Sequence, residues 1–320
     1  MTIIGTSMQD QLKVFAGSSN RPLAQEICDY IGIPLGAVEI TRFANDNIFV
    51  QIQENVREKD VFVVQSLSYP VSEHIMEMLI MIDALRSASA RRITAVIPYF
   101  SYARSDKKDH PRISITARLL ADLLETAGAN RVLTMTLHSP QVHGFFRVPT
   151  DHLTAVPIVC DYLQRNLDLS NVVALAADAG SAKRAGEYAA KLNIPMAFVD
   201  KRRLGDAAVE VRYVVGDVEG KDVIVFDDEI ATGGSLIATL HAIERVGVGK
   251  MYAGATHGVF CGPAPERIAA SPLQEVVVTN TVHIPPERRA PQVTILSVAS
   301  LFGEAIKRIH TGESVGALFV

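Results

Sequence analysis

Two adjacent carboxylates stand directly before a glycine-rich turn in the second half of the chain. Asp227 and Asp228 follow an apolar run, and the segment 231–235, with the sequence ATGGS, leads into a helical pattern. When a strand turns into a helix through glycines, backbone N–H groups and the positive end of the helix dipole gather at one place and bind anions. Since Thr232 and Ser235 add hydroxyl donors, the segment predicts a phosphate site.

The two carboxylates would repel that phosphate, so they suit a different part of the same ligand. Asp227 and Asp228 can accept hydrogen bonds from hydroxyl groups or face Mg²⁺. A phosphorylated sugar has a phosphate at one end and vicinal hydroxyls at the other, which fits both halves of the motif. The segment is not a P-loop, because no lysine follows the second glycine. An ordinary strand-to-helix turn with an aspartate cap is the simpler alternative.

Two further polar side chains stand at the ends of apolar runs. His138 and Asp178 each follow such a run, which would place them at the ligand-binding edge of a sheet. His138 could serve a metal or a phosphate, with a structural histidine as the alternative. Asp178 could be a carboxylate ligand of Mg²⁺, with a helix cap as the alternative. His143 does not complete a zinc motif, because neither H-E-x-x-H nor a set of cysteines is present.

Cationic side chains follow other apolar runs. Lys201 and Arg203 come after the run 195–199, and alternate residues of an extended chain share a side. These two could therefore close on a transferring phosphoryl group, while Arg202 would face away. Arg104 belongs to a basic loop that could grip a polyphosphate. A solvated surface loop is the alternative in both places.

An aromatic residue, Phe43, stands in the polar segment TRFANDNIF. A ring exposed in such a turn could stack on a nucleotide base. The alternative is the half-buried aromatic residue of a β-hairpin. The segment therefore adds a base-stacking hypothesis to the sites predicted for phosphate and hydroxyl groups.

Short apolar runs alternate with helical patterns along the whole chain. The runs are nearly continuous in Val, Ile, Leu, Phe and Ala, which is typical of strands covered on both faces. They predict strands at 13–18, 60–66, 92–100, 131–138, 171–178, 195–201, 222–229 and 251–258, and helices at 72–89, 114–128 and 235–247. This alternation predicts an α/β fold of mostly parallel sheets flanked by helices, with ligands beyond the carboxyl ends of the strands.

The composition is that of a globular protein of about two domains. The chain has 320 residues, of which 48% are hydrophobic and 21% charged. We predict a boundary that separates an N-terminal domain, residues 1–153, from a C-terminal domain, residues 154–320. The formal net charge of −4 gives no broad basic field for nucleic acid.

Cysteine usage and hydropathy predict a cytoplasmic protein without a membrane partner. The 3 cysteines lie far apart and have neither metal-ligand spacing nor a disulfide-rich pattern, which fits a reducing compartment. The N-terminus lacks a basic region followed by a cleavable apolar core. No apolar run reaches the ~20 residues that a membrane crossing needs.

Taken together, these segments resemble the ribose-phosphate pyrophosphokinase family over nearly the whole chain. The similarity rests on the order and spacing of five segments: 81–109, 131–146, 199–203, 220–235 and 252–268. The glycine-rich motif alone would not be specific, since phosphoribosyltransferases share it. The resemblance implies two tandem type I phosphoribosyltransferase-like domains, with the ATP side in the first, the ribose 5-phosphate loop in the second, and the last helix packing back on the first.

The resemblance also implies a reaction and its components. The diphosphoryl group of ATP would pass to the 1-hydroxyl of ribose 5-phosphate, giving phosphoribosyl pyrophosphate and AMP. Mg²⁺ would be the cofactor and ATP the co-substrate. The partners would be small molecules, and the chain would form a homo-oligomer assembled from dimers, up to a hexamer.

Site residues carry over from the family by position. The ATP-binding positions are Phe43, Asn45, Asp46, Asn47, Arg104 and Ser105. His138 and Asp178 match metal-linked positions, and His138, Lys201 and Arg203 match catalytic ones. The ribose 5-phosphate positions are Asp227, Asp228, Ala231, Thr232, Gly233, Gly234 and Ser235.

Several residues depart from the usual family pattern. Asn47 stands where a carboxylate is common, Ser105 replaces a glutamine, and Thr136 replaces an aspartate. Ala231 replaces an aspartate of the pentose phosphate loop, and the segment VHIPPERR also differs. Two alternatives therefore stay open: a phosphoribosyltransferase that consumes phosphoribosyl pyrophosphate, and a non-catalytic regulatory paralogue. The basic elements argue against the first, and the retained catalytic and metal-linked positions argue against the second.

Overall fold

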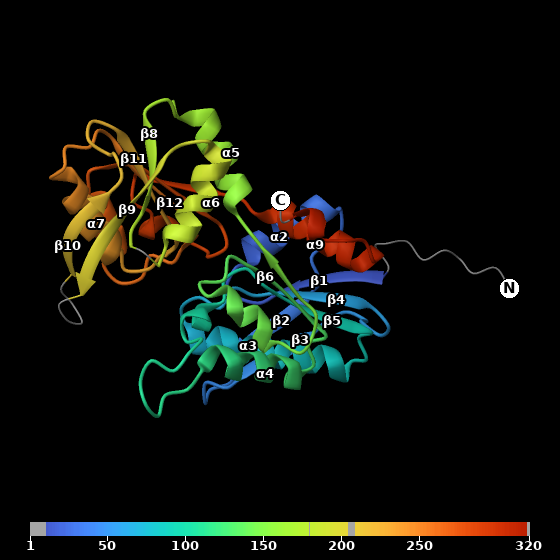
Figure 1. Ribbon diagram of the computed structural model, residues 1–320. Coiled ribbons are helices and arrows are strands. Elements are labelled where there is room, and N and C mark those ends of the chain that lie inside the picture. The colour runs from blue at the N-terminus through green and yellow to red at the C-terminus, as the bar shows by residue number, and fades with distance from the viewer. Residues whose placement is uncertain (1–10, 179, 204–208, 319–320) are drawn as a thin grey trace. The chain divides into compact units, whose positions relative to one another are not determined.

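The computed structural model describes residues 11–178, 180–203 and 209–318 and divides the chain into two compact units (Figure 1). Within the described residues, unit 1 comprises 11–154, 281–283 and 297–318, and unit 2 comprises Ala155–Asn280 and Ile284–Leu296. The last helix of the sequence therefore belongs to the same unit as the first strand.

Unit 1 is built around a five-stranded parallel sheet. Its strands follow the order β1 (Leu12–Ala16), β4 (Asp60–Val64), β5 (Arg92–Ile97), β6 (Arg131–Met135) and β7 (Thr150–Leu153). A separate antiparallel hairpin is formed by β2 (Val38–Arg42) and β3 (Ile48–Ile52). Every residue of β4 is buried, as expected for a strand covered on both faces.

Helices cover both faces of this sheet (Figure 1). They are α2 (Arg21–Ile31), α3 (Val71–Ser87), α4 (Thr116–Ala127) and α9 (Ala299–Thr311), with short 3₁₀ segments at Ser101–Arg104, Pro140–Phe145 and Gly316–Leu318. In α4 the buried residues Ala117, Leu120, Ala121 and Leu124 recur at helical spacing and join the core that α3 shares with the sheet.

Unit 2 contains a seven-stranded sheet that is parallel except at one edge. Its order is β10 (Val209–Val215), β9 (Met196–Arg203), β8 (Val172–Ala176), β11 (Asp222–Ile230), β12 (Met251–Gly258), β13 (Leu273–Thr279) and β14 (Val293–Leu296). Only β10 runs antiparallel to its neighbour, β9. The helices are α5 (Val156–Asn166), α6 (Ala182–Leu192), α7 (Gly234–Glu244) and α8 (Ala264–Ala269), with a 3₁₀ turn at Pro286–Arg288.

The sheet of unit 2 separates two hydrophobic cores. Along β11, Val223 and Val225 pack into the core that contains α7, whereas Ile224 and Phe226 pack into the core that contains α6. Phe226 stacks on the ring of Tyr188 from α6, with 4.1 Å between the ring centroids. Because successive side chains of a strand point to opposite faces, β11 is fixed between two helices on opposite sides of the sheet.

The predicted α/β class, with mostly parallel sheets flanked by helices, is confirmed. All predicted strands and helices are present with small shifts at their ends. The strands β2, β3, β7, β10, β13 and β14 were not predicted, and most of them are edge or hairpin strands with weaker apolar patterns. Within the described residues, no helix has both the length and the apolar composition that crossing a bilayer requires.

A buried carboxylate ties the C-terminal helix to the sheet of unit 1. Asp60, at the start of β4, is fully buried and accepts a hydrogen bond from Arg92 Nε at 2.8 Å. His310 Nδ1, in the last turn of α9, lies 2.8 Å from Asp60 Oδ2, and Arg92 also donates to the carbonyl of Ile309.

The same helix also packs closely against α2. At Gly303 of α9 a Cβ atom would lie 2.4 Å from the Tyr30 ring of α2, so a larger residue at this position would collide with that ring.

We predict that Asp60→Asn destabilises the protein by about 2–4 kcal/mol, because it leaves the buried guanidinium contact of Arg92 and the ring nitrogen of His310 without the carboxylate that they share. The free energy of unfolding would be measured by urea denaturation. Asp83→Asn is the matched control, since it removes a carboxylate whose side chain is 55% exposed in a surface ion pair with Arg86. That control should cost less than about 1 kcal/mol. Equal costs for the two variants would contradict the anchoring role of Asp60.

Candidate active site

The acidic pair of unit 2 lies inside strand β11 and not at its end. Backbone pairing with β12 continues through Asp227, opposite Ala255, to Ile230, opposite Gly258. The sequence predicted a strand over 222–229, which ends directly after the two carboxylates, and the structure extends it by one residue. The strand continues because Glu229 and Ile230 still have partners in β12, so the turn begins only at Ala231.

The two carboxylates of this pair differ in exposure, although both approach the same arginine. Asp228 is 1% exposed, and its Oδ1 accepts a hydrogen bond from Arg184 Nη1 of α6 at 2.6 Å. The side chain of Asp227 is 35% exposed, and its Oδ1 lies 3.3 Å from the same guanidinium nitrogen. Asp228 is thus buried against Arg184 of α6, and Asp227 is the member of the pair that a ligand can reach.

The electrostatic environment of Asp227 disfavours its charged form. Partial withdrawal from water, followed by the hydrogen bond and the negative charge of Asp228, raises the pKa of the Asp227 carboxyl to about 7. Arg184 opposes this shift but is already paired with Asp228. A carboxyl in this state favours a ligand that brings positive charge or hydroxyl donors to it.

The glycine turn connects β11 to α7. Gly233 adopts a φ of 72°, which a residue with a Cβ rarely adopts, and α7 begins at Gly234. Ile237 N–H donates to the carbonyl of Gly233 at 2.9 Å, which closes the first helical turn. The remaining N–H groups of a first helical turn have no partner within the helix, so the start of α7 has the geometry that binds anions.

Asp178 lies two residues beyond the end of β8, the strand next to β11. It follows β8, and Ala176 of β8 pairs with Phe226 of β11 in parallel register. The Asp178 Oδ1 accepts a hydrogen bond from Ser181 N–H at 2.8 Å, while Ser181 Oγ donates to the Asp178 carbonyl. The helix-cap geometry considered for this residue is thus present, and it occupies only one carboxylate oxygen.

The strand order explains why these groups meet. From β8 the chain proceeds to β9 on one side and later returns to β11 on the other side of β8. Ligands in open α/β sheets bind where the strand order reverses in this way, beyond the carboxyl ends of the strands. Asp178, Asp227 and the turn 231–235 all lie at that reversal point.

Strand β9 carries the predicted cationic pair at its end. Phe198 is the last residue of β9 that pairs with β8, and the strand continues to Arg203 as a ribbon with β10. The backbone of Lys201 and Arg203 thus has the predicted extended form at the carboxyl end of a strand next to β8. The side chains of these two residues lie outside what the structure describes.

In unit 1, the proposed base-binding segment forms the turn of the β2–β3 hairpin. Phe43 N–H donates to the carbonyl of Asn47 at 3.0 Å, and Asp46 adopts a φ of 67°. The Phe43 ring is 58% exposed and contacts the Phe49 ring edge-on, with 5.4 Å between centroids. The hairpin considered as the alternative is therefore present, and it leaves one aromatic face accessible. Asn45 lies in the same turn, where its side chain accepts a hydrogen bond from Asn47 N–H.

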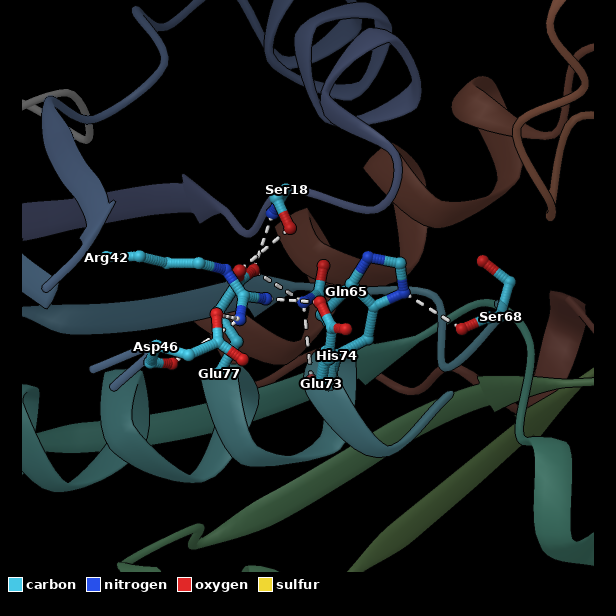
Figure 2. A network of polar contacts seen from close by, with 8 residues as sticks. All are labelled: Ser18, Arg42, Asp46, Gln65, Ser68, Glu73, His74 and Glu77. Carbon is cyan, nitrogen blue, oxygen red and sulfur yellow. Dashed lines mark hydrogen bonds and ion pairs between the residues drawn. The ribbon is translucent and has the colours of Figure 1, made fainter. Parts of the chain in front are cut away.

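A cation that the sequence did not single out holds this turn. Figure 2 shows Arg42 between Asp46 of the turn and Glu73 of α3. Arg42 Nη1 lies 2.8 Å from Asp46 Oδ1, and Arg42 Nη2 pairs with Glu73. Arg42 therefore links the orientation of the hairpin turn to the helix that packs on the sheet.

The same view contains a buried polar network around Glu77 (Figure 2). Glu77, only 5% exposed, accepts hydrogen bonds from Ser18 N–H at 2.6 Å and Ser18 Oγ at 2.7 Å. Gln65, the residue after β4, donates from Nε2 to Glu77 Oε1 at 2.6 Å, so the loop after β1 is held by Gln65 and by Glu77 of α3. Gly17 fits here because a Cβ atom would lie 2.4 Å from the Gln65 amide.

The remaining predicted residues of unit 1 follow adjacent strands. Arg104 and Ser105 lie after β5, and Ala117 N–H of α4 donates to the Ser105 carbonyl at 3.2 Å. His138 follows β6 and is half-buried, and Thr136 before it adopts a φ of 42°. Since β5 and β6 are parallel neighbours, these residues share one edge of the unit 1 sheet.

The candidate metal-linked carboxylates, Asp178 and Asp227, lie singly along the ligand edge of the unit 2 sheet. Among the residues that the structure describes, no three side chains of His, Cys, Asp or Glu come together as a metal-ligating group. Mg²⁺ commonly binds through one or two carboxylates together with water and substrate phosphates. The accessible carboxylate of Asp227 and the second oxygen of Asp178 fit that sparse kind of site.

The fold defines an α/β protein whose candidate site residues lie at the carboxyl ends of parallel strands. A family model described as the N-terminal domain of ribose phosphate pyrophosphokinase matches residues 12–128. A second, described as the phosphoribosyl synthetase-associated domain, matches residues 208–320.

Individual relatives match along almost the whole chain. A ribose-phosphate pyrophosphokinase of Deinococcus radiodurans is 54% identical over 317 residues, covering 98% of this chain and 99% of the relative. That of Synechococcus elongatus is 50% identical over 311 residues, covering 97% and 94%. The crystal structure of phosphoribosylpyrophosphate synthetase from Mycobacterium smegmatis has 40% identity and a TM-score of 0.90, covering 94% of this chain and 99% of that one. The chain belongs to the ribose-phosphate pyrophosphokinase family.

We predict that Asp227→Asn raises the thermal unfolding midpoint more at pH 8 than at pH 5, measured without divalent cations. The native carboxyl has a pKa of about 7, and an unfolded aspartate titrates near ~3.9. Between these values the folded state binds more protons, so stability from this group is lost as pH rises toward 7. The amide of the Asp227→Asn variant does not titrate in this pH range, so the variant does not lose stability in this way.

Asp161→Asn is the matched control, because it removes an exposed carboxylate from α5 of the same unit. Its effect on the unfolding midpoint should be small and similar at both pH values. A pH-independent effect of Asp227→Asn would contradict the raised pKa of this carboxyl.

Proposed function

We propose that the chain catalyses Mg²⁺-dependent transfer of the diphosphoryl group of ATP to the 1-hydroxyl of ribose 5-phosphate. The observation that carries the proposal is the pairing of an accessible Asp227 with an anion-binding glycine turn at the reversal point of the unit 2 sheet. Its family membership supports the choice of this reaction among those that such a site could serve.

The glycine turn would hold the sugar by its phosphate. Backbone N–H groups at the start of α7 and the hydroxyls of Thr232 and Ser235 are donors for the 5-phosphate oxygens. Asp227 would accept hydrogen bonds from the ring hydroxyls, while Asp228 stays paired with Arg184 and supports the position of Asp227. Ala231 has no polar group, so the sugar contact there would be apolar.

Unit 1 would supply the nucleotide contacts. The exposed ring of Phe43 would stack on the adenine, with Asn45, Asp46 and Asn47 around it in the same turn. Arg104 and Ser105, after β5, would contact the phosphates. His138 and Asp178 are the positions that the family resemblance links to the metal ion.

The reaction itself needs positioning and charge neutralisation more than a covalent intermediate. The sugar 1-hydroxyl oxygen forms a bond to the β-phosphorus of ATP. The bond from that phosphorus to the α,β-bridging oxygen breaks, AMP leaves with that oxygen, and the hydroxyl proton passes to solvent. When bound, Mg²⁺ would neutralise charge on the phosphoryl oxygens. Lys201 and Arg203 would bring positive charge to the transferred group.

We also propose a cytoplasmic homo-oligomer assembled from dimers. The cysteine usage supports the compartment, since Cys28 and Cys160 are buried free thiols and Cys261 is half-buried. Sedimentation of the purified chain would give its mass as a multiple of 34.7 kDa, and a hexamer is the largest assembly expected. A monomer at micromolar concentration would contradict this part of the proposal.

The proposal is tested by incubating the pure protein with Mg²⁺-ATP and ribose 5-phosphate and measuring AMP and phosphoribosyl pyrophosphate. Equal amounts of both products are expected. Failure to form AMP, combined with consumption of phosphoribosyl pyrophosphate in the presence of a nucleobase, would favour a phosphoribosyltransferase. Absence of both activities would favour the non-catalytic paralogue.

We predict that Lys201→Ala lowers kcat by about 10²–10³-fold, because it removes positive charge from the transferred group. The unfolding midpoint should change little, since β9 extends beyond its pairing with β8 at this position. Arg202→Ala removes the same charge from the neighbouring residue and serves as the control, with a small expected effect. Full activity of the Lys201 variant would overturn its catalytic role.

A further inference from the structure

Two arginines lie behind the glycine turn on segments that the proposed reaction does not use. Arg267, on α8, donates from Nη1 to the carbonyl of Thr232 at 2.9 Å. Arg288, in the 3₁₀ turn Pro286–Arg288, donates from Nη2 to the carbonyls of Phe260 at 2.7 Å and Gly262 at 3.0 Å. Both side chains therefore bind backbone oxygen atoms in unit 2, close to the predicted phosphate site.

Arg267 determines the direction of one peptide group in the turn. The carbonyl of Thr232 and the N–H of Gly233 belong to the same trans peptide and point in opposite directions. Because Arg267 draws the carbonyl to its own side, the N–H of Gly233 points away from α8. This N–H has no acceptor in the described part of the chain.

Arg288 acts on the peptide between Ala231 and Thr232, and it does so through the peptide between Phe260 and Cys261. The carbonyl of Phe260, which Arg288 binds, shares a peptide with the N–H of Cys261. That N–H points the opposite way and donates to the carbonyl of Ala231 at 3.0 Å. The N–H of Thr232, in the same peptide as this carbonyl, is turned outward from Cys261 and also lacks an acceptor in the described residues.

The segment that transmits this effect is strained. Phe260 adopts a φ of 44°, in the left-handed region that residues with a Cβ rarely occupy, and Gly262 adopts a φ of 56°. Such a conformation persists only when surrounding contacts hold it, and the two hydrogen bonds from Arg288 are contacts of that kind. The hydrogen bonds from Arg288 therefore hold this conformation and, with it, the direction of the Cys261 N–H.

Arg267 also contributes a charge that is not neutralised. Its side chain is exposed, and in the described residues it has no ion pair with a carboxylate. Its Nη1 lies 3.5 Å from the position that a Cβ atom of Gly234 would take, so the charge lies beside the first residue of α7. A phosphate dianion at the turn would be attracted by this charge as well as by the peptide groups.

We propose that Arg267 and Arg288 are positioning residues for the phosphate of the sugar substrate. Each fixes one peptide of the segment 231–233, so that two successive carbonyls face the protein and two N–H groups face the ligand. Arg267 adds electrostatic attraction, whereas Arg288 acts only through Cys261. This inference rests on the proposed function, because it assigns a sugar phosphate to the turn.

The test is direct binding of ribose 5-phosphate and of ATP to the full-length protein, measured by calorimetry and independent of turnover. Arg267→Ala should weaken ribose 5-phosphate binding by about tenfold, and Arg288→Ala by about threefold to tenfold, because charged hydrogen bonds are lost at or behind the turn. ATP binding should be unchanged in both. Arg267→Lys should recover part of the affinity, since it keeps the charge.

Ionic strength separates the two roles. The dissociation constant for ribose 5-phosphate should depend less on salt in Arg267→Ala than in the wild type. In Arg288→Ala the salt dependence should stay as in the wild type. Arg245→Ala, at the opposite end of α7, removes one exposed positive charge in the same unit and is the control, with no expected change in affinity.

Each outcome has a defined meaning. Wild-type affinity for ribose 5-phosphate in both arginine variants would overturn the inference and leave the proposed reaction intact. Parallel losses of ATP and ribose 5-phosphate binding would indicate a general structural effect and would also overturn it. Normal ribose 5-phosphate binding without AMP formation by the wild type would overturn only the reaction. No ribose 5-phosphate binding by the wild type would overturn both.

Discussion

The buried carboxylate of Asp228 is the constraint on which the candidate site of unit 2 depends. A charge that is 1% exposed needs a cation, and Arg184 of α6 supplies it at 2.6 Å. This pair fixes β11 to α6 just where the strand approaches the ligand edge. The neighbouring Asp227 also approaches Arg184 but stays partly accessible, and its negative charge is disfavoured beside Asp228.

The strand order then places this carboxylate beside an anion site. The order in which the chain adds strands reverses between β8 and β11, so the residues that follow these two strands lie at one edge of the sheet. On one side of the turn stands the raised-pKa carboxyl of Asp227, and on the other stand the start of α7 and the guanidinium of Arg267. Opposite electrostatic environments thus lie a few residues apart, which suits a ligand with a phosphate at one end and hydroxyls at the other.

In unit 1 the equivalent edge is organised differently. Its strands follow in simple order from β1 to β7, and the predicted nucleotide residues come from a separate hairpin and from the ends of β5 and β6. Ion pairs of Arg42 hold the hairpin turn against α3, while the buried network of Glu77 fixes the loop after β1. In unit 1 the candidate residues are therefore positioned by side-chain ion pairs and hydrogen bonds, whereas in unit 2 they are brought together by the reversal of strand order.

The sequence by itself determined the α/β class, the principal strands and the family, because buried parallel strands leave continuous apolar runs and the motifs keep their order. It also located the turn 231–235. Only the tertiary structure distinguished the accessible Asp227 from the buried Asp228, since exposure depends on how the folded chain covers each side chain. It alone identified Arg184 and Arg288, whose partners are distant in sequence. Hydrogen bonds to backbone carbonyls leave no sequence pattern, so the direction of the peptides in the turn could be decided only by the folded chain.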